Sequence, residues 1–410
     1  MIRLPGGARV TGRLPALLLL AAAVGLFLAT VPLHRNWFDL RVYHEAVHHW
    51  VHDGGPLYGY RVPGQDYGFT YPPFAALCML PLALLDWPAA LTAGLLVNAA
   101  ATAAVVVLLA GPVLRGRVHG RRYALAVTGC LVLLLEPVRD TLSFGQVNLV
   151  LLALVLADTR LAAHGGRAAR FAGLGTGLAA AVKLTPALFI GYLLLAGRRR
   201  AAAVAAATAV AATLLAAWAA PGTSHDYWTE ALRDTDRIGD LAYISNQSLQ
   251  GLLARLAGSA GDAGRAVWAV GVVLVLAVWA RRVRRARAAG DTAAGPALTG
   301  AAACLISPVT WVHHLVWLLP ALAVLAAAAL SRPPGRRAAP FAVAVGAYVL
   351  LCSSVVWLWR SGAPGVGGFL GGNAYVWLAL AMLLALPVGA GSQHLPADQR
   401  VQRQDAGQQR

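Results

Sequence analysis

Long apolar stretches separated by short polar or basic segments make up most of this chain. The apolar stretches are residues 14–33, 71–86, 89–111, 123–137, 147–163, 171–184, 185–197, 200–220, 264–281, 296–309, 311–330, 339–358 and 374–390. A transmembrane helix needs about 20 mainly apolar residues, so several of these stretches are too short to span a membrane alone. The pattern predicts an all-α, polytopic membrane protein with about 11–13 transmembrane or re-entrant helices. They would form one embedded domain over residues 1–391, followed by a disordered polar tail over residues 392–410.

Composition and charge agree with a membrane location. Hydrophobic residues make up 58% of the 410 residues and charged residues 12%, against about 25% charged residues in an average soluble protein. The net charge of +17 lies in basic clusters between the apolar stretches, at residues 3–13, 115–122, 160–170, 198–200, 281–287 and 332–337. Such clusters are typical of cytoplasmic loops, and no nucleic-acid partner is expected. The N-terminus would therefore lie inside, in a multi-pass protein of the plasma membrane.

Two longer polar segments remain for the outer face, residues 34–70 and 221–262, with shorter ones at 138–146 and 359–373. The chain must cross the membrane an odd number of times between Thr70 and Arg115, because the first ends an outer segment and the second begins a basic cluster. We expect residues 71–111 to make one net crossing, with 71–86 short or re-entrant.

The first outer segment contains an amphipathic pattern over residues 39–53. One helical face carries Leu40, Tyr43, Val47, Trp50 and Val51, and the pattern ends at Gly54-Gly55-Pro56. A helix of this kind lies on the outer membrane surface with its Trp and Tyr at the interface. Asp39 stands at its start, either as a first-turn carboxylate favoured by the helix dipole or as a general base for an acceptor hydroxyl.

The same helix contains His44-Glu45-Ala46-Val47-His48, a match to the H-E-x-x-H motif of zinc hydrolases. A zinc-dependent membrane hydrolase is therefore one alternative for the function. This stretch holds four histidines in nine positions, however, and no third ligand motif follows. The polar face of an interfacial helix is the better interpretation, and no metal site is expected.

Lys183 is the one lysine among 34 basic residues, and it lies in the middle of the apolar residues 171–197. Basic clusters flank this stretch on both sides, so it must turn back, and we expect the turn at Lys183-Leu184-Thr185-Pro186. The lysine would then sit at the tip of a helical hairpin on the outer side. The ammonium either snorkels to the interface or binds an anion, and a phosphate is a natural partner for it.

Other polar groups lie at the outer ends of apolar stretches. Gln146 and Asn148 could hydrogen-bond a sugar or cap the following helix, and the same alternatives hold for Asn246 and Gln247. The pair His313-His314 follows a proline break beside Trp311, which favours a lined cavity over a single helix-to-helix hydrogen bond.

Taken in order, these residues resemble glycosyltransferase family 87. The matching series is Asp39 followed by Val42-Tyr43, then Gly-x-x-x-Tyr, Thr70-Tyr71-Pro72-Pro73-Phe74, Gly145-Gln146-Val147-Asn148, Val182-Lys183-Leu184-Thr185-Pro186, Ser245-Asn246-Gln247-Ser248 and Ser307-Pro308-Val309-Thr310-Trp311-Val312-His313-His314. The resemblance covers about residues 15–390. It implies a GT-C-type fold, a site that opens to the outer face, and an inverting transfer, in which Asp39 occupies the position of the catalytic carboxylate. The family includes polyprenol-phosphate-mannose-dependent α-1,2-mannosyltransferases of actinobacterial cell-envelope biosynthesis.

The resemblance implies partners and roles for the candidate residues. The donor would be a polyprenyl-phosphate-linked sugar and the acceptor a glycolipid or glycan. We expect Asp39 to be the base, and Lys183, His313, His314 and Arg139 to bind the leaving phosphate. We expect Tyr43, Tyr71, Gln146, Asn148, Asn246 and Gln247 to contact substrate. No cofactor or metal is needed, because no diphosphate leaves. An arabinofuranosyltransferase of the same family and a lipid or sugar transporter or flippase without catalysis remain alternatives.

Overall fold

The computed structural model describes residues 12–31, 36–65, 67–114, 120–164, 166–234, 239–257, 262–362 and 365–389, and within these ranges all regular secondary structure is helical. The α-helices are α1 (Arg13–Thr30), α2 (Phe38–His52), α3 (Pro73–Met79), α4 (Trp87–Leu114), α5 (Arg121–Leu134), α6 (Glu136–Phe144), α7 (Asn148–His164), α8 (Leu174–Val182), α9 (Leu188–Leu195), α10 (Arg199–Ala219), α11 (Pro221–Asp226), α12 (Leu249–Ala257), α13 (Asp262–Ala288), α14 (Ala294–Ile306), α15 (Leu319–Leu330), α16 (Ala338–Cys352), α17 (Gly365–Gly372) and α18 (Ala374–Ala385). Short 3₁₀ segments are η2 (Leu57–Gly59), η3 (Leu80–Leu84), η4 (Arg167–Phe171), η5 (Thr185–Ala187), η8 (Val312–Leu318), η9 (Pro334–Arg336) and η10 (Val355–Trp359), and η6 (Tyr227–Ala231) is a π-helical turn.

Helices of membrane-spanning length and apolarity confirm a polytopic membrane protein. Within the described ranges five helical stretches qualify: α1, α4, α10, most of α13, and η8 with α15. Two further pairs, α6 with α7 and α17 with α18, qualify as broken spans, bent by 119° and 62°. The remaining apolar stretches form shorter helices. Many of the expected 11–13 elements are therefore bent or partial helices rather than straight spans, because proline and glycine interrupt them.

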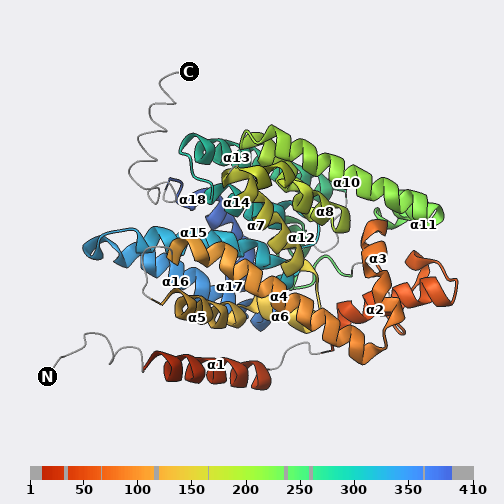
Figure 1. The fold of residues 1–410 in the computed structure, drawn as a ribbon, viewed down its shortest axis with the longest axis horizontal. Helices are drawn as coiled ribbons and strands as arrows, with labels where there is room; N and C mark the ends of the chain where they lie inside the picture. Colours follow the sequence, from red (N-terminus) through yellow and green to blue (C-terminus); the bar gives the residue numbers. More distant parts are fainter. Residues whose placement is uncertain are drawn as a thin grey trace.

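The first helix lies apart from the rest of the bundle. Figure 1 shows α1 at the edge of the molecule, and its closest helical neighbour is α5. Only Val24 of this helix is buried, whereas leucines such as Leu19 and Leu26 are exposed. A helix that is apolar on all sides and uncovered by protein is suited to lipid on most of its circumference.

The apolar residues 171–197 form a helical hairpin, as expected. A Cβ on Gly173, just before α8, would clash with the carbonyl oxygen of Ala201 near the start of α10. Helix α9 leads directly into α10 through Arg198. The beginning of α8 and the end of α9 therefore both lie near the start of α10. The break at Lys183 is at the other end of the hairpin.

Close packing of α8 on α10 gives a stability prediction. A Cβ on Gly177 would meet the carbonyl oxygen of Ala205 and lie 2.6 Å from Cβ of Thr208. Gly177→Ala is expected to lower the free energy of unfolding by about 1–3 kcal/mol, because the helices would have to move apart. The midpoint of thermal unfolding in detergent measures this effect.

The matched control is Gly346→Ala, in the exposed middle of α16, where an added Cβ meets no atom within 4 Å. Alanine is the better helix former, so this variant should be as stable as the parent or slightly more so. Equal midpoints for the two variants would contradict the close contact between α8 and α10.

The segment that follows the first outer loop turns back on α2 before the chain crosses the bundle. Before α3, the Tyr71 hydroxyl accepts a hydrogen bond from Tyr43 of α2. After η3, the Leu85 carbonyl lies 2.9 Å from Nε2 of His44, also in α2. Both ends of the segment therefore contact α2, which agrees with the short or re-entrant segment expected there. The 28-residue helix α4 then makes the one long passage before the basic cluster.

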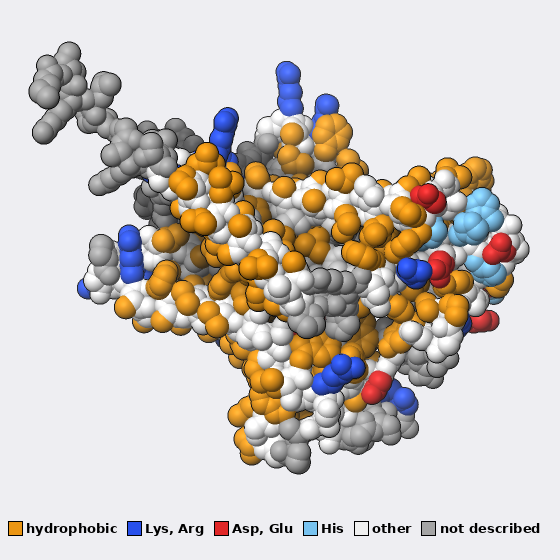
Figure 2. All heavy atoms as spheres, turned by 90° about the horizontal axis from the view of Figure 1, so that it is seen from below, with side chains coloured by type: hydrophobic (Ala, Val, Ile, Leu, Met, Phe, Trp, Pro, Cys, Tyr) orange, Lys and Arg blue, Asp and Glu red, His pale blue; other side chains and the backbone are white. Residues whose placement is uncertain are grey.

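Helix α2 runs from Phe38 to His52, one residue earlier at each end than predicted, and much of its apolar face is covered by protein instead of lipid. Leu40, Tyr43 and Val47 are buried in a cluster with aromatic and small side chains from the loop after α2 and from α3. Val51 stays exposed. The expectation of a helix lying on the membrane surface was wrong for this buried face, because α3 and η3 fold back to cover it. Histidine and acidic side chains gather at one end of the face shown in Figure 2, and the rest of that face is largely hydrophobic.

Candidate active site

Polar side chains from five separate segments form one connected network at the start of α2. Its members are Asp39 and Tyr43 of α2, Tyr71 before α3, Gln146 and Asn148 between α6 and α7, Lys183 after α8, and His314 of η8. We call this set the Asp39–Lys183 network. It brings together seven of the residues expected from the sequence to act on substrate.

The backbone around α2 fixes Asp39 against the turn between α6 and α7. Trp37, the residue before the helix, adopts a left-handed conformation with φ of 45°, and its N–H donates to the Ser143 carbonyl at 3.1 Å. On the other side Gly145, with φ of 70°, lets Leu40 approach, and an added Cβ would lie 2.5 Å from that of Leu40. A strained non-glycine residue next to a candidate catalytic carboxylate is typical of functional sites.

The environment of Asp39 suits a base that works near neutral pH. Burial raises the pKa of this carboxyl from 3.8 to about 6, while a hydrogen bond from Gln146 and the charge of Lys183 act in the opposite direction. The side chain keeps part of its surface accessible. A carboxylate with such a pKa is mostly ionised at pH 7 and is a stronger base than an ordinary aspartate.

Two tyrosines connect α2 to the remainder of the network. The Tyr43 hydroxyl donates to the Tyr71 oxygen at 2.9 Å, and the Tyr71 hydroxyl donates to Oε1 of Gln146 at 2.9 Å. Burial and the nearby Asp39 charge raise the pKa of both phenols, so both stay protonated. The amide oxygen of Gln146 is thus occupied, and its amide group is oriented so that it can donate to Asp39.

Lys183 occupies the far end of the network, in the extended residue that ends α8. Its Nζ donates to Oδ1 of Asn148 at 3.0 Å and lies 3.4 Å from the Tyr71 oxygen, with the tyrosine ring centroid at 5.2 Å. Nε2 of His314 is 2.9 Å from the same nitrogen. Thr185 and Pro186 begin η5 directly afterwards, so the helix break holds the lysine in place.

The contacts of His314 connect η8 to Lys183. The Trp311 N–H lies 3.2 Å from Nδ1 of His314, at the start of η8. Nε2 of the same ring lies 2.9 Å from the Lys183 nitrogen. The imidazole and the ammonium are therefore direct neighbours in the network.

His313 lies beside the network and contributes to packing. Its ring contacts those of Phe144 and His314, with centroids 5.3 and 4.6 Å apart, and it is 5% exposed. Its carbonyl oxygen accepts from Thr141 at 3.2 Å and from Asn148 at 3.5 Å. The observed contacts thus assign it to positioning η8 against α6 and α7.

Arg139 belongs to a second polar cluster. Its guanidinium donates to the Cys352 carbonyl at 3.0 Å and to Ser354 Oγ at 3.2 Å, and it stacks over the ring of Phe27. This cluster continues through Glu136, which accepts hydrogen bonds from Trp357 and Tyr375. Among the described contacts, none joins Arg139 to Lys183 or to Asp39, which argues against the expected role in binding the donor phosphate.

Asn246 and Gln247 are fully buried and bonded to backbone. Asn246 donates to the carbonyls of Leu241 and Pro308 and accepts from Thr310 N–H. Gln247 donates to the carbonyls of Ile244 and Gly372 and accepts from Tyr375 N–H. Because the protein itself uses these groups, the structure argues against the expected contact with substrate.

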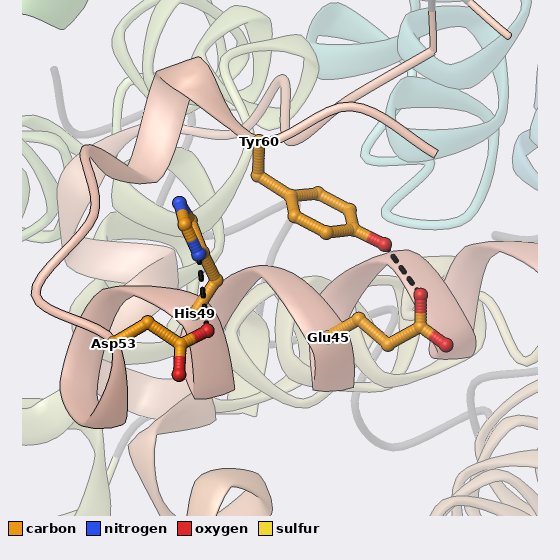
Figure 3. A network of polar contacts seen from close by, with 4 residues as sticks. All are labelled: Glu45, His49, Asp53 and Tyr60. Carbon is orange, nitrogen blue, oxygen red and sulfur yellow. Dashed lines mark hydrogen bonds and ion pairs between the residues drawn. The ribbon is translucent and has the colours of Figure 1, made fainter. Parts of the chain in front are cut away.

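The match to the zinc motif has a structural explanation. Nε2 of His44 donates to the Leu85 carbonyl, and Glu45 accepts from the Tyr60 hydroxyl and lies 3.6 Å from Arg41. Figure 3 shows Tyr60 pointing at Glu45, and the neighbouring pair His49 and Asp53 on the next turns. No group of three or more potential metal ligands occurs in the part of the chain that the structure describes. This arrangement argues against the zinc-hydrolase alternative.

Comparison with known proteins identifies the family. The sequence profile of glycosyltransferase family 87 matches residues 69–308. Two relatives are each a polyprenol-phosphate-mannose-dependent α-(1-2)-phosphatidylinositol mannoside mannosyltransferase. The one from Mycolicibacterium smegmatis is 34% identical over 86% of this chain and 84% of its own length. The one from Mycobacterium tuberculosis is 36% identical over 84% of this chain and 83% of its own.

A third relative, the phosphatidylinositol pentamannoside mannosyltransferase of M. smegmatis with the same donor dependence, is 33% identical over 81% of this chain and 80% of its own length. No solved structure matches the chain. The family profile covers more than half of the 410 residues, and the relatives align with most of them. The chain belongs to glycosyltransferase family 87 and is a membrane glycosyltransferase.

Proposed function

We propose that this enzyme transfers a mannosyl residue from polyprenyl-phosphate-mannose to a phosphatidylinositol mannoside, forming an α-1,2 linkage by inverting displacement. The observation that carries the proposal is the Asp39–Lys183 network, which places one carboxylate and one ammonium in a single set of hydrogen bonds. A reaction that removes a proton from a hydroxyl and releases a phosphate needs these two groups. The names of the relatives supply the donor, the acceptor and the linkage.

The α8–α9 hairpin supports a site on the extracytoplasmic side of the plasma membrane. Its open end lies beside the basic residues Arg198 to Arg200 at the start of α10, and Lys183 lies at its tip. Arginine clusters between spans mark the cytoplasmic side. The tip, and with it the network, would therefore face outward, where a lipid-linked donor replaces water-soluble nucleotide sugars.

In the proposed reaction Asp39 acts as the general base. The acceptor hydroxyl oxygen attacks the anomeric carbon of the donor mannose while its proton passes to the carboxylate of Asp39. The bond between the anomeric carbon and the phosphate oxygen breaks, and polyprenyl phosphate leaves with the bonding electron pair. A single displacement of this kind inverts the configuration at the anomeric carbon.

Lys183 and His314 would bind the leaving phosphate. Their nitrogens are 2.9 Å apart, so a phosphate oxygen that displaces this direct contact would accept from the ammonium and from an N–H of the imidazole. Both bonds would grow stronger as negative charge develops on the leaving group. Asn148 and Tyr71 keep the ammonium in place and are therefore positioning residues for the donor.

The pKa of Asp39 predicts how the transfer rate depends on pH. The base must be ionised, so the rate at low substrate concentration is expected to rise through about pH 6, the pKa of the buried carboxyl. One pH unit below that pKa, the rate should be about tenfold lower than its plateau at high pH. The measurement is the rate of transfer of labelled mannose between pH 4.5 and 8.

The control for this profile is Asp53→Asn, which removes an exposed carboxylate at the other end of α2. It should leave the midpoint where it is in the parent enzyme. A rate that stays flat between pH 5 and 7, or that falls as the pH rises through 6, would contradict the assignment of Asp39 as the base.

A further inference from the structure

A set of aromatic side chains adjoins the Asp39–Lys183 network. It consists of Phe38, Tyr67, Tyr243, Trp311 and Trp357, which we call the aromatic row. These residues come from α2, from the loops that precede α3, α12 and η8, and from η10. All of these segments other than α2 are short connections, so five distant parts of the sequence contribute to one feature.

The rings form two groups in contact, one on each side of Gly239. The rings of Phe38 and Tyr67 meet edge to face with centroids 5.6 Å apart. Tyr67 then packs on the backbone of Gly239, whose φ of 98° turns its Cα toward the ring, and an added Cβ would lie 2.5 Å from the Tyr67 oxygen. Tyr243 follows four residues later, and its ring meets those of Trp311 and Trp357 edge to face, with centroids 6.1 and 6.0 Å apart.

The row touches the candidate active site at two points. Phe38 is bonded directly to Asp39, the proposed base. The backbone N–H of Trp311 holds His314, one of the two proposed phosphate ligands. From there the row continues away from the reaction centre to Trp357, which donates to the carboxylate of Glu136. A ligand that occupies the active site and extends beyond it would therefore meet these rings.

The aromatic row differs from the aromatic belt that anchors membrane proteins in lipid. Belt residues are exposed singly at the interface, and Trp218 on α10 has a comparably high exposure of 82%. Members of the row are partly covered by one another; Tyr67 is 37% exposed, and Tyr243, Trp311 and Trp357 are half-buried. Tyr67 also lies within electrostatic reach of two carboxylates, Asp39 and Asp240. Aromatic faces next to carboxylates suit a ligand with apolar and hydroxyl groups on the same molecule.

A pyranose ring is such a ligand. Its axial C–H groups form an apolar patch that packs on the negative face of an aromatic ring, and its hydroxyls donate to carboxylates. We infer that the aromatic row is an acceptor subsite that binds the mannose units next to the one that reacts. This inference rests on the proposed function and adds the part of the acceptor that the enzyme recognises: its glycan beyond the reacting sugar.

The experiment uses the full-length enzyme with labelled polyprenyl-phosphate-mannose and a series of soluble acceptors: methyl α-mannoside, the α-mannobioside and the α-mannotrioside. In the parent enzyme KM should fall as the acceptor lengthens. Tyr243→Ala is expected to raise KM for the trioside about three- to tenfold, the value of one stacking contact, while leaving KM for the donor unchanged. Tyr67→Ala should act in the same way, and Tyr67→Phe, which keeps the ring, should restore most of the affinity.

Trp218→Ala is the matched control, because it removes an aromatic ring from a highly exposed position on α10, outside the aromatic row. It should leave KM for every acceptor unchanged. If Tyr243→Ala and Tyr67→Ala lowered kcat equally for all three acceptors, or raised KM for the donor, the aromatic row would have only a structural role and the inference would be overturned. Absence of any mannosyl transfer by the parent enzyme would instead overturn the proposed function, so the two failures are distinguishable.

Discussion

Asp39→Asn is expected to slow mannosyl transfer by about a hundred- to ten-thousandfold, the usual contribution of a positioned general base. The substitution keeps the size of the side chain and removes the carboxylate that accepts the acceptor proton. The measurement is the transfer of label from polyprenyl-phosphate-mannose to a phosphatidylinositol mannoside, together with binding of the donor to the purified variant.

Asp53→Asn serves as the control for this prediction as well, since it removes a carboxylate from the same helix at an exposed place. It should retain near-normal transfer. Donor binding should persist in Asp39→Asn, because Lys183, Asn148 and His314 remain in place. Near-normal transfer by the Asn variant would remove Asp39 as the base, whereas a transporter without catalysis would show no transfer even in the parent protein.

The local parts of the site could be predicted from the sequence. Lys183 stood out because a charge within an apolar stretch is costly, and basic clusters on both sides required the chain to turn back there. The structure has the break at this residue. The bounds of α2 followed, to within one residue, from its helical periodicity and from the Gly54-Gly55-Pro56 stop. Each of these signals comes from a short stretch of about 30 residues or fewer, because helical periodicity and helix-breaking residues are local features of a sequence.

The features of the site that the sequence could not predict depend on contacts between residues far apart in the chain. Arg139 was a weaker candidate than Lys183 for binding the phosphate, but nothing in the sequence showed its partners: a carbonyl and a hydroxyl from residues 352–354, more than 200 positions away. Asn246 and Gln247 carry the same amides as Asn148 and Gln146. Their backbone partners reduce their capacity to meet a ligand, and those partners also come from distant loops. The buried face of α2 was assigned to lipid for the same reason.

The hydrogen bonds of the Asp39–Lys183 network place neutral side chains between its two charges, the carboxylate of Asp39 and the ammonium of Lys183. Gln146 bonds to Asp39 and accepts from Tyr71, and Asn148 bonds to Gln146 and accepts from Lys183. An ammonium in direct contact with the carboxylate would lower the pKa of the base and weaken it. The two amides hold both groups in place while keeping them apart, so each remains available to its own part of the reaction.

Lys183→Met is therefore expected to reduce transfer by about a hundred- to a thousandfold, as the loss of one preorganised charge-stabilising group does. Methionine is also unbranched and fills much of the same space, so the break between α8 and α9 should remain. The variant should also lose most of its inhibition by free polyprenyl phosphate, the leaving group. Lys183→Arg should recover only part of both properties, because the broad guanidinium cannot take the place of a compact ammonium between Asn148 and His314.

Arg41→Gln is the matched control, since it removes a positive charge from the exposed side of α2, where Arg41 pairs with Glu45 and stacks over Trp87. It should leave inhibition by polyprenyl phosphate unchanged. Unfolding midpoints separate loss of fold from loss of binding in both variants.

If Lys183→Met kept normal inhibition by polyprenyl phosphate but transferred slowly, the ammonium would act elsewhere in the reaction. If Arg139→Gln lost that inhibition instead, the phosphate would bind at the cluster around Glu136 and not at Lys183.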